Sequence, residues 1–293
     1  MCGITGIFSF DNSVQSYEPY IHKSLQLLNK RGPDASGSHF FNKFAAAHAR
    51  LSIIDTSSLA NQPFFDPTGQ FMLVFNGEIF NFQELKSFLS QKYQVQFKTN
   101  SDTEVLLYLL IHEGTNSLNK LNGFWAFAFY NNHSKTCIIA RDRLGKKPLW
   151  YTHQNSFFCF ASEFKALNAY PINKVLDTKS ISLFFRLSYL PSPYTPFSNI
   201  HKLEPGCYLN ISEEGTISKH RYFNLPYYEK SSAIDYVNAQ KHVKELIHKS
   251  VAQRLISDVP MGAFLSGGLD SAIVSAVAKQ HQSDLNTFCL SFP

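Results

Sequence analysis

The sequence predicts an α+β fold for roughly the first 170 residues and the start of an α/β unit with a parallel sheet after them. The N-terminal part is a succession of short strand-like runs with few helical stretches between them. The C-terminal part alternates helix and buried strand. A chain of 293 residues, 44% hydrophobic and 17% charged, is long enough for two domains with sizeable cores.

Short apolar runs in the N-terminal part predict strands. These runs are Gly3–Phe10, Phe44–Ile54, Met72–Phe75, Trp125–Tyr130, Thr136–Ala140, Leu149–Tyr151 and Phe157–Ser162. Two helices are predicted between them: Tyr20–Asn29 is amphipathic, and Thr103–His112 is apolar nearly all round, as expected of a helix clamped against a sheet. Many strands with few helices predict two sheets packed face to face, with helices on the outside.

The pattern changes after residues 191–224, which are rich in Pro, Tyr and turn residues, and after the polar stretch Tyr227–Ala233, which is typical of a linker. The elements then predicted are a long amphipathic helix, a strand, an apolar helix and a strand, at Ala239–Leu255, Gly262–Leu265, Ser271–His281 and Asn286–Phe292. This order predicts the opening of a βαβ unit.

Composition argues against several classes of partner. The longest apolar run, Phe124–Tyr130, is far shorter than the roughly 20 residues that cross a bilayer, so we expect no membrane partner and a cytoplasmic location. The net charge is +5, but the basic residues are spread along the chain, so no nucleic-acid partner is expected. Paired phenylalanines among strand-like residues are expected to turn one ring to a core; they are Phe40-Phe41, Phe64-Phe65, Phe157-Phe158 and Phe184-Phe185.

The cysteines are far apart and include no CxxC pair, which argues against a disulfide framework or a four-thiolate zinc site. Cys137, Cys159 and Cys289 lie in apolar runs and are predicted to be small buried hydrophobic residues. Cys2 differs, because removal of Met1 would leave its α-amine free beside its own thiol. An α-amine has a pKa of about 7.7 and can take a proton from a thiol near neutrality. Taken alone, Cys2 is equally an ordinary thiol near a terminus.

Four polar segments accompany this cysteine: Arg31–Asp34 (RGPD), His48–Asp55 (HARLSIID), Phe75–Asn81 (FNGEIFN) and Ser101–Glu104 (SDTE). Each has a structural alternative, such as a turn, a hairpin apex at Asn-Gly, or a helix N-cap with acidic residues. Together, at these spacings behind Cys-Gly-Ile, they resemble the class II glutamine amidotransferases. That family has an N-terminal-nucleophile fold, an αββα sandwich, and hydrolyses glutamine. The resemblance covers about residues 2–220 and, through NGFWAFA at 122–128 and ARDRLGKKPL at 140–149, points to the asparagine synthetase branch.

The resemblance implies a role for each matching residue. Cys2 would attack the glutamine carboxamide, while the Asn76 side chain and the Gly77 backbone N–H would donate to the oxyanion. Arg50 would hold the substrate α-carboxylate with its planar fork, and Asp102 with Glu78 would hold the α-ammonium. The remaining glutamine pocket would be lined by Leu51, Ser52, Ile53 and Ile54.

The second part carries SGGLDS at Ser266–Ser271, between a predicted strand and a predicted helix. A Gly-rich turn at a helix N-terminus can cradle phosphate, although it can also be a plain turn with a cap, and no Walker-type GxxxxGK[ST] loop occurs. The motif resembles the pyrophosphate loop of ATP pyrophosphatases, and SDVPMG at 257–262 resembles asparagine synthetases. The resemblance implies that Leu265 and Leu290 touch the nucleotide. It also implies that the phosphates are bound by Ser266, Gly267, Gly268 and Ser271, with Asp270 near magnesium pyrophosphate; the metal ligands stay unassigned.

The expected layout is therefore a glutaminase domain at 2–220, a linker at 221–235 and the start of a synthetase domain at 236–293. The synthetase domain of the family continues for some hundreds of residues, so the chain is either a fragment of a longer protein or a truncated descendant.

Three functions fit these residues and the resemblance. The first is a glutamine-hydrolysing asparagine synthetase, a carbon–nitrogen ligase that takes glutamine, aspartate and ATP. Its synthetase half would use ATP and Mg²⁺, its glutaminase half would need no cofactor, and a homodimer is allowed. The others are an amidotransferase of the same branch acting on a sugar-acid or peptide carboxylate, and a truncated binding protein without turnover.

Overall fold

The computed structural model describes residues 1–11, 13–226 and 235–291. Contacts between residues divide the chain into two compact units, each described by itself below. The first unit is Met1–Ser52 with Ser57–Asn224, and the second is Ile53–Thr56 with Leu225–Pro293. Most of the predicted linker, residues 227–234, lies outside the described residues. The functions assigned to the predicted domains stay predictions.

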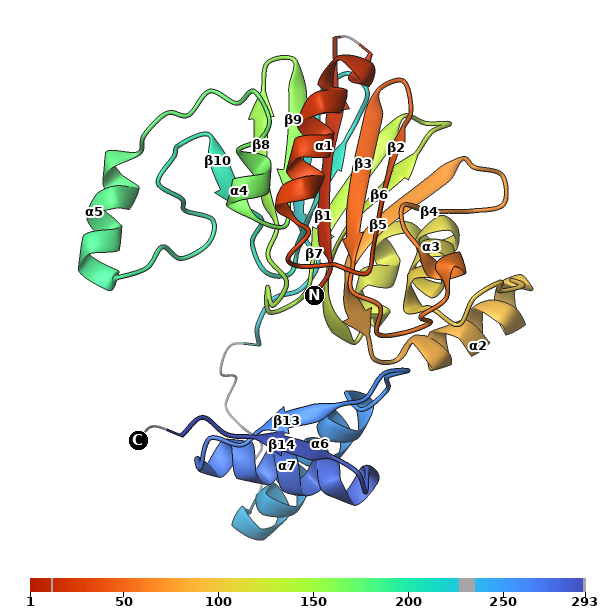
Figure 1. Cartoon of the computed structure of the whole chain (residues 1–293), viewed down its shortest axis with the longest axis vertical. Coiled ribbons are helices and arrows are strands. Elements are labelled where there is room, and N and C mark those ends of the chain that lie inside the picture. The colour runs from red at the N-terminus through yellow and green to blue at the C-terminus, as the bar shows by residue number, and fades with distance from the viewer. Residues whose placement is uncertain (12, 227–234, 292–293) are drawn as a thin grey trace. The chain divides into compact units, whose positions relative to one another are not determined.

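The first unit contains two six-stranded sheets (Figure 1). One sheet has the order β10-β8-β9-β1-β3-β2 and the other β12-β11-β7-β6-β5-β4. The first sheet consists of β1 (Gly3–Ser9), β2 (Ala35–Phe40), β3 (Phe44–Arg50), β8 (Trp150–Gln154), β9 (Phe157–Ala161) and β10 (Ile200–Lys202). The second consists of β4 (Phe64–Phe65), β5 (Phe71–Ile79), β6 (Gly123–Asn131), β7 (Thr136–Arg141), β11 (Cys207–Ile211) and β12 (Ile217–Arg221).

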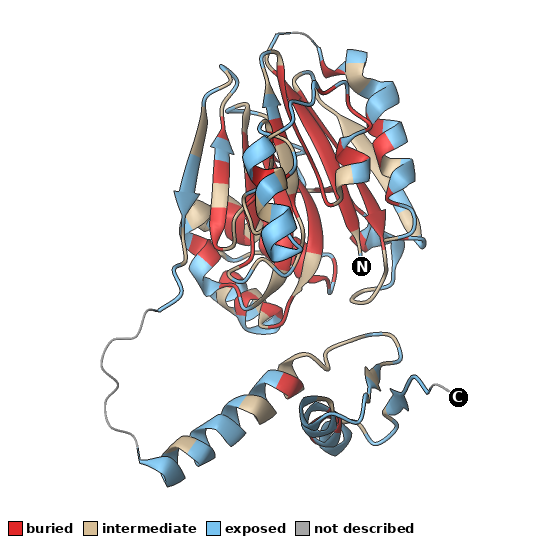
Figure 2. Cartoon of the chain, turned by 90° about the vertical axis from the view of Figure 1, so that its left-hand side faces the viewer, coloured by how far each residue is buried: buried red, intermediate tan, exposed pale blue. Residues whose placement is uncertain are grey.

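Successive side chains of a strand point to opposite faces of its sheet. The strands therefore contribute to two cores, an inner one between the sheets and an outer one on the opposite face. On β3, Phe44 and Ala46 belong to the core that also holds Met72 and Val74 of β5, so these side chains lie between the two sheets. The intervening alanines of β3 face the outer core with residues of α1 (Glu18–Leu27) and α4 (Phe164–Leu167). Figure 2 shows the central strands as buried along most of their length.

The second sheet is covered by α3 (Asp102–Glu113), against which α2 (Phe82–Tyr93) packs. The predicted αββα sandwich is confirmed. Helix α2 was not predicted, because its buried side chains Phe82, Leu85 and Leu89 are separated by polar residues and give a weak apolar signal. The 3-10 turns of this unit are η1 (Val14–Tyr17), η2 (Ser58–Ala60) and η3 (Gly114–Lys120).

Several local predictions for the first unit are wrong. The strand predicted to reach Ile54 ends at Arg50, where its partner β2 begins, and the N–H of Ser52 donates to the Asp34 carboxylate instead. Phe184 and Phe185 lie on α5 (Thr178–Leu187) and not in a strand, and both are exposed. The segment 191–224 contains β10, β11 and β12, which its turn-rich composition concealed.

The second unit has the predicted β-α-β order. Its elements are α6 (Tyr236–Gln253), β13 (Gly262–Phe264), α7 (Leu269–His281) and β14 (Asn286–Phe288), and the two strands pair in parallel. Its core is small, with Val251, Val277 and Ala278 buried. Cys289 follows β14 and is exposed, so the prediction of a buried thiol there is wrong. No helix within the described ranges is long and apolar enough to span a bilayer.

Candidate active site

The candidate nucleophile lies at the start of the central strand of the first sheet. Gly3 is the first residue of β1 and pairs with Ala49, which places Cys2 opposite the end of β3. The backbone N–H of Leu51 donates to the Cys2 sulfur over 3.4 Å. Burial raises the pKa of the Cys2 thiol, and the bond from Leu51 opposes that rise. The sulfur therefore needs a base nearby to become a thiolate near neutrality.

The RGPD segment packs against the same end of β3. Nε of Arg31 donates to the backbone oxygen of Cys2 over 2.8 Å, and Nη1 donates to Glu163 over 2.9 Å. Gly32 has no room for a side chain, because a Cβ there would lie 2.2 Å from the Ala49 oxygen. The residue pattern of this segment predicted no individual role for Arg31, which secures the backbone of the candidate nucleophile.

Asn76 and Gly77 lie inside β5, opposite Ala126 and Trp125 of β6, so the alternative of a hairpin apex is wrong. Asn76 follows the alternation of Met72 and Val74 and therefore points between the sheets. Its side chain is fully buried, and neither amide atom has a hydrogen-bond partner among the described residues. Buried amides are nearly always bonded, so an orphaned pair of donor and acceptor atoms calls for a ligand.

Gly77 has a separate steric reason to be glycine. A Cβ at this position would lie 2.3 Å from the Phe124 oxygen and 2.7 Å from the Trp125 Cα. These contacts are far too short for any larger residue, so the backbone here can approach β6 only because no side chain intervenes.

Two buried charged groups lie at the same end of the sandwich. Arg50 ends β3, and its Nη1 donates to the Ser57 oxygen and to Asn61 Oδ1, each over 2.7 Å. Asp102 opens α3, and burial raises the pKa of its carboxyl to about 7. Ser101 caps this helix by accepting the N–H of Glu104 over 3.2 Å, so the SDTE segment forms a helix cap and also carries a buried acid.

Charged groups that are not bonded to the Cys2 sulfur also shift the pKa of its thiol. Asp102 raises the pKa of the Cys2 thiol and Lys147 lowers it, so both groups lie near the sulfur. Lys147 belongs to the ARDRLGKKPL segment, whose residue pattern indicated the family but predicted no site residue. Glu78 continues β5 beyond Gly77 and is only partly buried.

The structure thus brings together the nucleophile, the amide pair and both buried charged groups: Cys2, Asn76, Gly77, Arg50 and Asp102. Leu51 and Ser52 follow β3 directly and are partly buried beside Cys2. Ile53 and Ile54 are grouped with the second unit, and their place in a glutamine pocket stays a prediction.

The SGGLDS loop of the second unit joins β13 to α7. The backbone N–H of Ser266 donates to Ser271 Oγ over 3.2 Å, and Ser271 Oγ donates to the Gly268 oxygen over 2.9 Å. Gly267 has φ +81°, which favours glycine. Gly268 is the N-cap of α7 and has no side chain to cap it, so the start of this 13-residue helix can receive an anion.

The other residues predicted to contact ATP lie at the same edge of the small sheet. Leu265 directly follows β13, and Leu290 lies just beyond β14. Because the two strands are parallel, their carboxyl ends meet at one edge, where nucleotides bind in open α/β sheets. Asp270 is exposed in the first turn of α7. Within the described ranges, no group of three acidic, His or Cys side chains is arranged to hold a metal ion.

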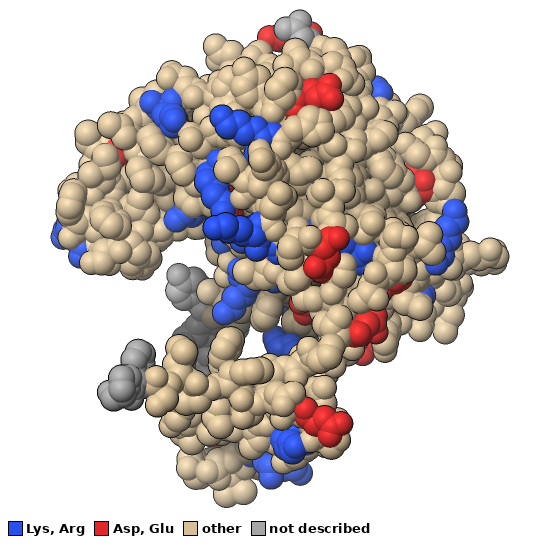
Figure 3. All heavy atoms as spheres, in the orientation of Figure 1, with Lys and Arg blue, Asp and Glu red and all other residues tan. Residues whose placement is uncertain are grey.

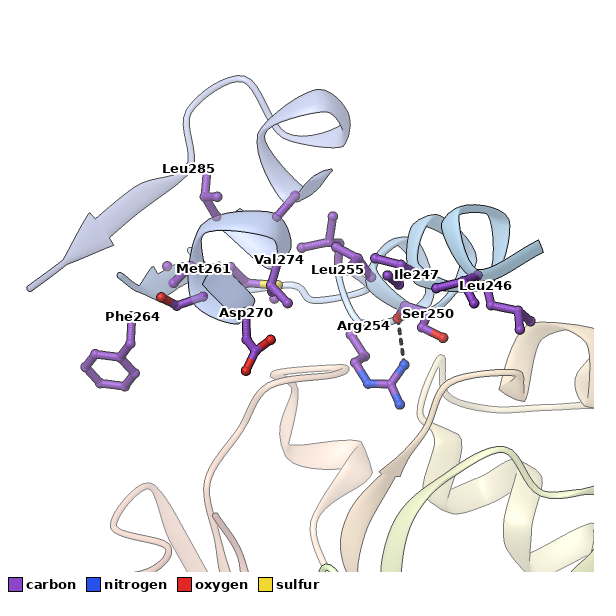
Figure 4. Close-up of a pocket in the computed structure, with 16 residues that line it drawn as sticks. Leu246, Ile247, Ser250, Arg254, Leu255, Met261, Phe264, Asp270, Val274 and Leu285 are labelled. Atoms are coloured by element: carbon purple, nitrogen blue, oxygen red, sulfur yellow. Dashed lines mark hydrogen bonds between the residues drawn. The ribbon is translucent and has the colours of Figure 1, made fainter. Parts of the chain in front are cut away.

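An apolar groove of about 680 Å³ lies between α6 and α7 in this unit (Figure 4). Its walls include Leu246 and Ile247 of α6 and Val274 of α7, and Asp270 of the SGGLDS loop also lines it. The groove is therefore continuous with the loop, but its lining is mostly hydrocarbon. On the face shown in Figure 3, basic and acidic side chains lie scattered among uncharged atoms.

A family profile described as "Glutamine amidotransferase domain" matches residues 1–223. The chain belongs to the glutamine amidotransferase domain family. A second profile, described as "Asparagine synthase", matches residues 242–293 of the chain. The predicted resemblance to both families is thereby confirmed.

Curated relatives are similar over all or nearly all of the chain. It is 35% identical to asparagine synthetase [glutamine-hydrolyzing] 1 of Bacillus subtilis, covering 100% of this chain and 46% of the relative. A putative asparagine synthetase [glutamine-hydrolyzing] 2 of Methanocaldococcus jannaschii is 34% identical, with 100% of this chain and 60% of the relative covered. Asparagine synthetase B of Escherichia coli is 33% identical, over 96% of this chain and 45% of the relative. The chain thus spans about half the length of the curated relatives it matches.

Solved structures agree on the fold. Glutamine phosphoribosylpyrophosphate amidotransferase from B. subtilis, complexed with ADP and GMP, is similar with a TM-score of 0.54 at 21% identity, covering 98% of this chain and 65% of that one. An allosteric regulatory enzyme of purine biosynthesis is similar with a TM-score of 0.56 at 20% identity, again over 98% and 65% of the two chains. At such identity the likeness concerns the fold alone.

Proposed function

We propose that the first unit hydrolyses glutamine at Cys2, and that the whole protein uses the ammonia to amidate aspartate at the expense of ATP. One observation carries the first part of the proposal. Asn76 presents a buried amide without a partner in the described part of the chain, pointing between the sheets at the end where Cys2 lies. A preorganised donor of this kind is what a developing oxyanion requires.

Each step of hydrolysis has a residue to perform it. After removal of Met1, the α-amine of Cys2 takes the proton of its thiol, and the sulfur attacks the carboxamide carbon of glutamine. The resulting oxyanion accepts from Asn76 Nδ2–H and the Gly77 N–H. Its collapse breaks the C–N bond, and the leaving nitrogen takes the proton from the α-ammonium and departs as ammonia. Water then attacks the thioester, which gives glutamate and restores the thiol.

Substrate orientation falls to the two buried charged groups. Arg50 offers a planar guanidinium that matches the α-carboxylate of glutamine. Asp102, assisted by Glu78, offers negative charge to the α-ammonium, and the bound ammonium would in turn lower the raised pKa of Asp102. Leu51 and Ser52, with Ile53 and Ile54, would line the pocket around the side chain.

The second unit would bind ATP at its SGGLDS loop. The N–H groups at the start of α7, which has no side-chain cap from Gly268, and the side chains of Ser266 and Ser271 suit phosphate oxygens. Leu265 and Leu290 would offer apolar contact to the nucleotide. Asp270 offers one hard oxygen ligand for Mg²⁺, which would neutralise phosphate charge when bound. Aspartate as the acceptor is supported by the names of the curated relatives, and no observation favours a sugar acid, a peptide carboxylate or a binding role without turnover. A homodimer and a cytoplasmic location belong to the same proposal.

Release of glutamate and ammonia from glutamine by the purified chain tests the proposal. We expect turnover that Cys2→Ala reduces by more than about a thousandfold, because the nucleophile is lost. Circular dichroism and glutamine binding by the variant should stay close to those of the parent. Full activity of a pure Cys2→Ala sample, or an inactive parent that is correctly folded, would refute a Cys2 glutaminase.

A further inference from the structure

Two side chains hold the backbone of Phe75 at the edge of β5. β4 pairs with Leu73 and Met72 of β5, and no strand within the described residues lies beside Phe75 on this edge. There, the Phe75 N–H donates to Gln62 Oε1 over 2.6 Å. The Phe75 carbonyl lies 3.0 Å from His48 Nε2, and because a carbonyl only accepts, the ring nitrogen is the donor.

These two side chains come from different parts of the first unit. His48 lies on β3 of the other sheet and reaches across the sandwich, fully buried. Gln62 follows η2, and its amide nitrogen also donates to Thr103 Oγ1 over 3.3 Å. Thr103 is the neighbour of Asp102 on α3. The two peptides that flank Phe75 in β5 are thus tied down separately: the one after it to the facing sheet through His48, and the one before it to the helix that carries Asp102 through Gln62.

The His48 ring is neutral near neutral pH, so it has a single N–H to donate to the Phe75 oxygen. Burial lowers the pKa of its ring to about 3, so the ring is neutral near neutrality and carries a single proton. The contact with Phe75 places that proton on Nε2. Nδ1 has no partner in the described part of the chain. A buried polar atom left unbonded has a cost in stability, which a purely structural residue would have no reason to retain.

We propose that His48 and Gln62 are positioning residues that hold the backbone on the two sides of Phe75, so that Asn76 and Gly77 point their donors at the oxyanion; this rests on the proposed glutaminase function. The Phe75 carbonyl that His48 holds belongs to the peptide plane that ends at the Asn76 Cα, and both the Asn76 side chain and the peptide that carries the Gly77 N–H extend from that atom. A shift of this plane therefore displaces both donors. A misplacement of about 1 Å in such a group can cost about a hundredfold in rate.

Steady-state kinetics of His48→Leu and Gln62→Met test the proposal. Each substitution removes one bond to Phe75 while roughly keeping the side-chain volume. We expect kcat to fall about 10- to 100-fold with KM within about twofold, since the misplaced donors serve the transition state. His48→Gln, whose amide can donate to the same carbonyl, should recover most of the loss. Thr152→Val is the matched control, because the buried Thr152 of β8 donates through Oγ1 to the Asn199 oxygen and the substitution removes that bond; it should lower the melting temperature and leave kcat unchanged.

A double-mutant cycle shows whether the effect passes through Asn76. In an Asn76→Ala background, His48→Leu should reduce kcat by less than it does in the parent, because one of the two donors that His48 positions is already absent. Equal reductions in both backgrounds, or an unchanged kcat in His48→Leu and Gln62→Met, would overturn the proposal.

Amide hydrogen exchange keeps this test separate from the proposed function, since it needs no turnover. The Asn76 and Gly77 amides should exchange faster in His48→Leu than in the parent, while those of β9 stay unchanged. Unchanged exchange at Asn76 and Gly77 would refute positioning by His48 even in a chain without glutaminase activity. If the parent chain were inactive but His48→Leu still exchanged faster than the parent at Asn76 and Gly77, only the glutaminase function would be refuted.

Discussion

The carboxylate of Asp102 accepts a hydrogen bond from the backbone N–H of Ile79, with the two atoms 3.0 Å apart. Asp102 opens α3 and Ile79 ends β5, so this bond joins the helix to the strand that carries Asn76 and Gly77. The acid is buried, and its partner is a backbone group whose position the sheet determines. The bond therefore fixes the charge proposed to bind the α-ammonium of glutamine relative to the donors proposed for the oxyanion.

The raised pKa of Asp102 predicts a pH-dependent affinity for glutamine. Only the ionised carboxylate attracts the substrate ammonium, and a group with a pKa of about 7 goes from about one tenth to about nine tenths ionised between pH 6 and 8. We expect the dissociation constant of glutamine to fall about tenfold over that range. Calorimetry on the Cys2→Ala variant measures binding without turnover, and Asp102→Asn in the same background should abolish the trend.

The same pKa predicts the sign of a stability effect. Because the folded state holds the Asp102 proton to higher pH than the unfolded state, whose pKa is about 3.9, this group costs stability as the pH rises from about 4 to about 7. Asp102→Asn cannot ionise and keeps an oxygen for the Ile79 N–H. The melting temperature of Asp102→Asn minus that of the parent should therefore increase as the pH rises from about 4 to about 7. A decrease of this difference over the same range would contradict a raised pKa of Asp102.

Asn76→Ala and Arg50→Lys should separate catalysis from binding. Loss of one oxyanion donor typically costs about a hundred- to a thousandfold in kcat, so Asn76→Ala should lower kcat by that amount with little change in KM. Arg50→Lys keeps the charge but loses the planar fork, so KM should rise with kcat nearly unchanged. Stopped assays over a range of glutamine concentrations give both constants. A pure KM effect in Asn76→Ala would argue against its role at the oxyanion.

Removal of Met1 should accompany activity when the chain is expressed from this sequence. The proposed base is the α-amine of Cys2, and a retained Met1 would convert that amine into a peptide nitrogen that cannot take a proton. Intact-mass measurement should show a chain that begins at Cys2. An active preparation in which Met1 is retained on every molecule would exclude the α-amine as base.

The 293-residue polypeptide should hydrolyse glutamine without making asparagine. The small sheet of the second unit pairs only β13 with β14, and Phe264 and Phe288 beside the loop are exposed, so the loop lacks the rigid surroundings that adenylation requires. Incubation with glutamine, aspartate, ATP and Mg²⁺ should yield glutamate and ammonia but no AMP or pyrophosphate. Stoichiometric pyrophosphate release by this polypeptide would contradict the expectation.

The sequence by itself identified the family, the candidate nucleophile and most of the strands. Cys2 and the RGPD, FNGEIFN and SDTE segments are recognisable by residue type and spacing, and the strand runs by their short apolar composition. The β-α-β order of the second unit was also predictable, because apolar residues recur with different periods in strands and in helices. These features are local, and a local pattern records the chemistry of its own residues.

Only the tertiary structure decided what each local pattern faces. Asn-Gly at 76–77 has the composition of a hairpin apex, but pairing with β6 holds it within β5. Phe184 and Phe185 resemble core residues, but their helix leaves them exposed, as is Cys289. Burial and bonding depend on residues distant in sequence: His48 and Phe75 are 27 positions apart, yet one hydrogen bond joins them across the sandwich. Periodicity along a chain carries no information about such a partner, because the folding of the two sheets against each other creates it.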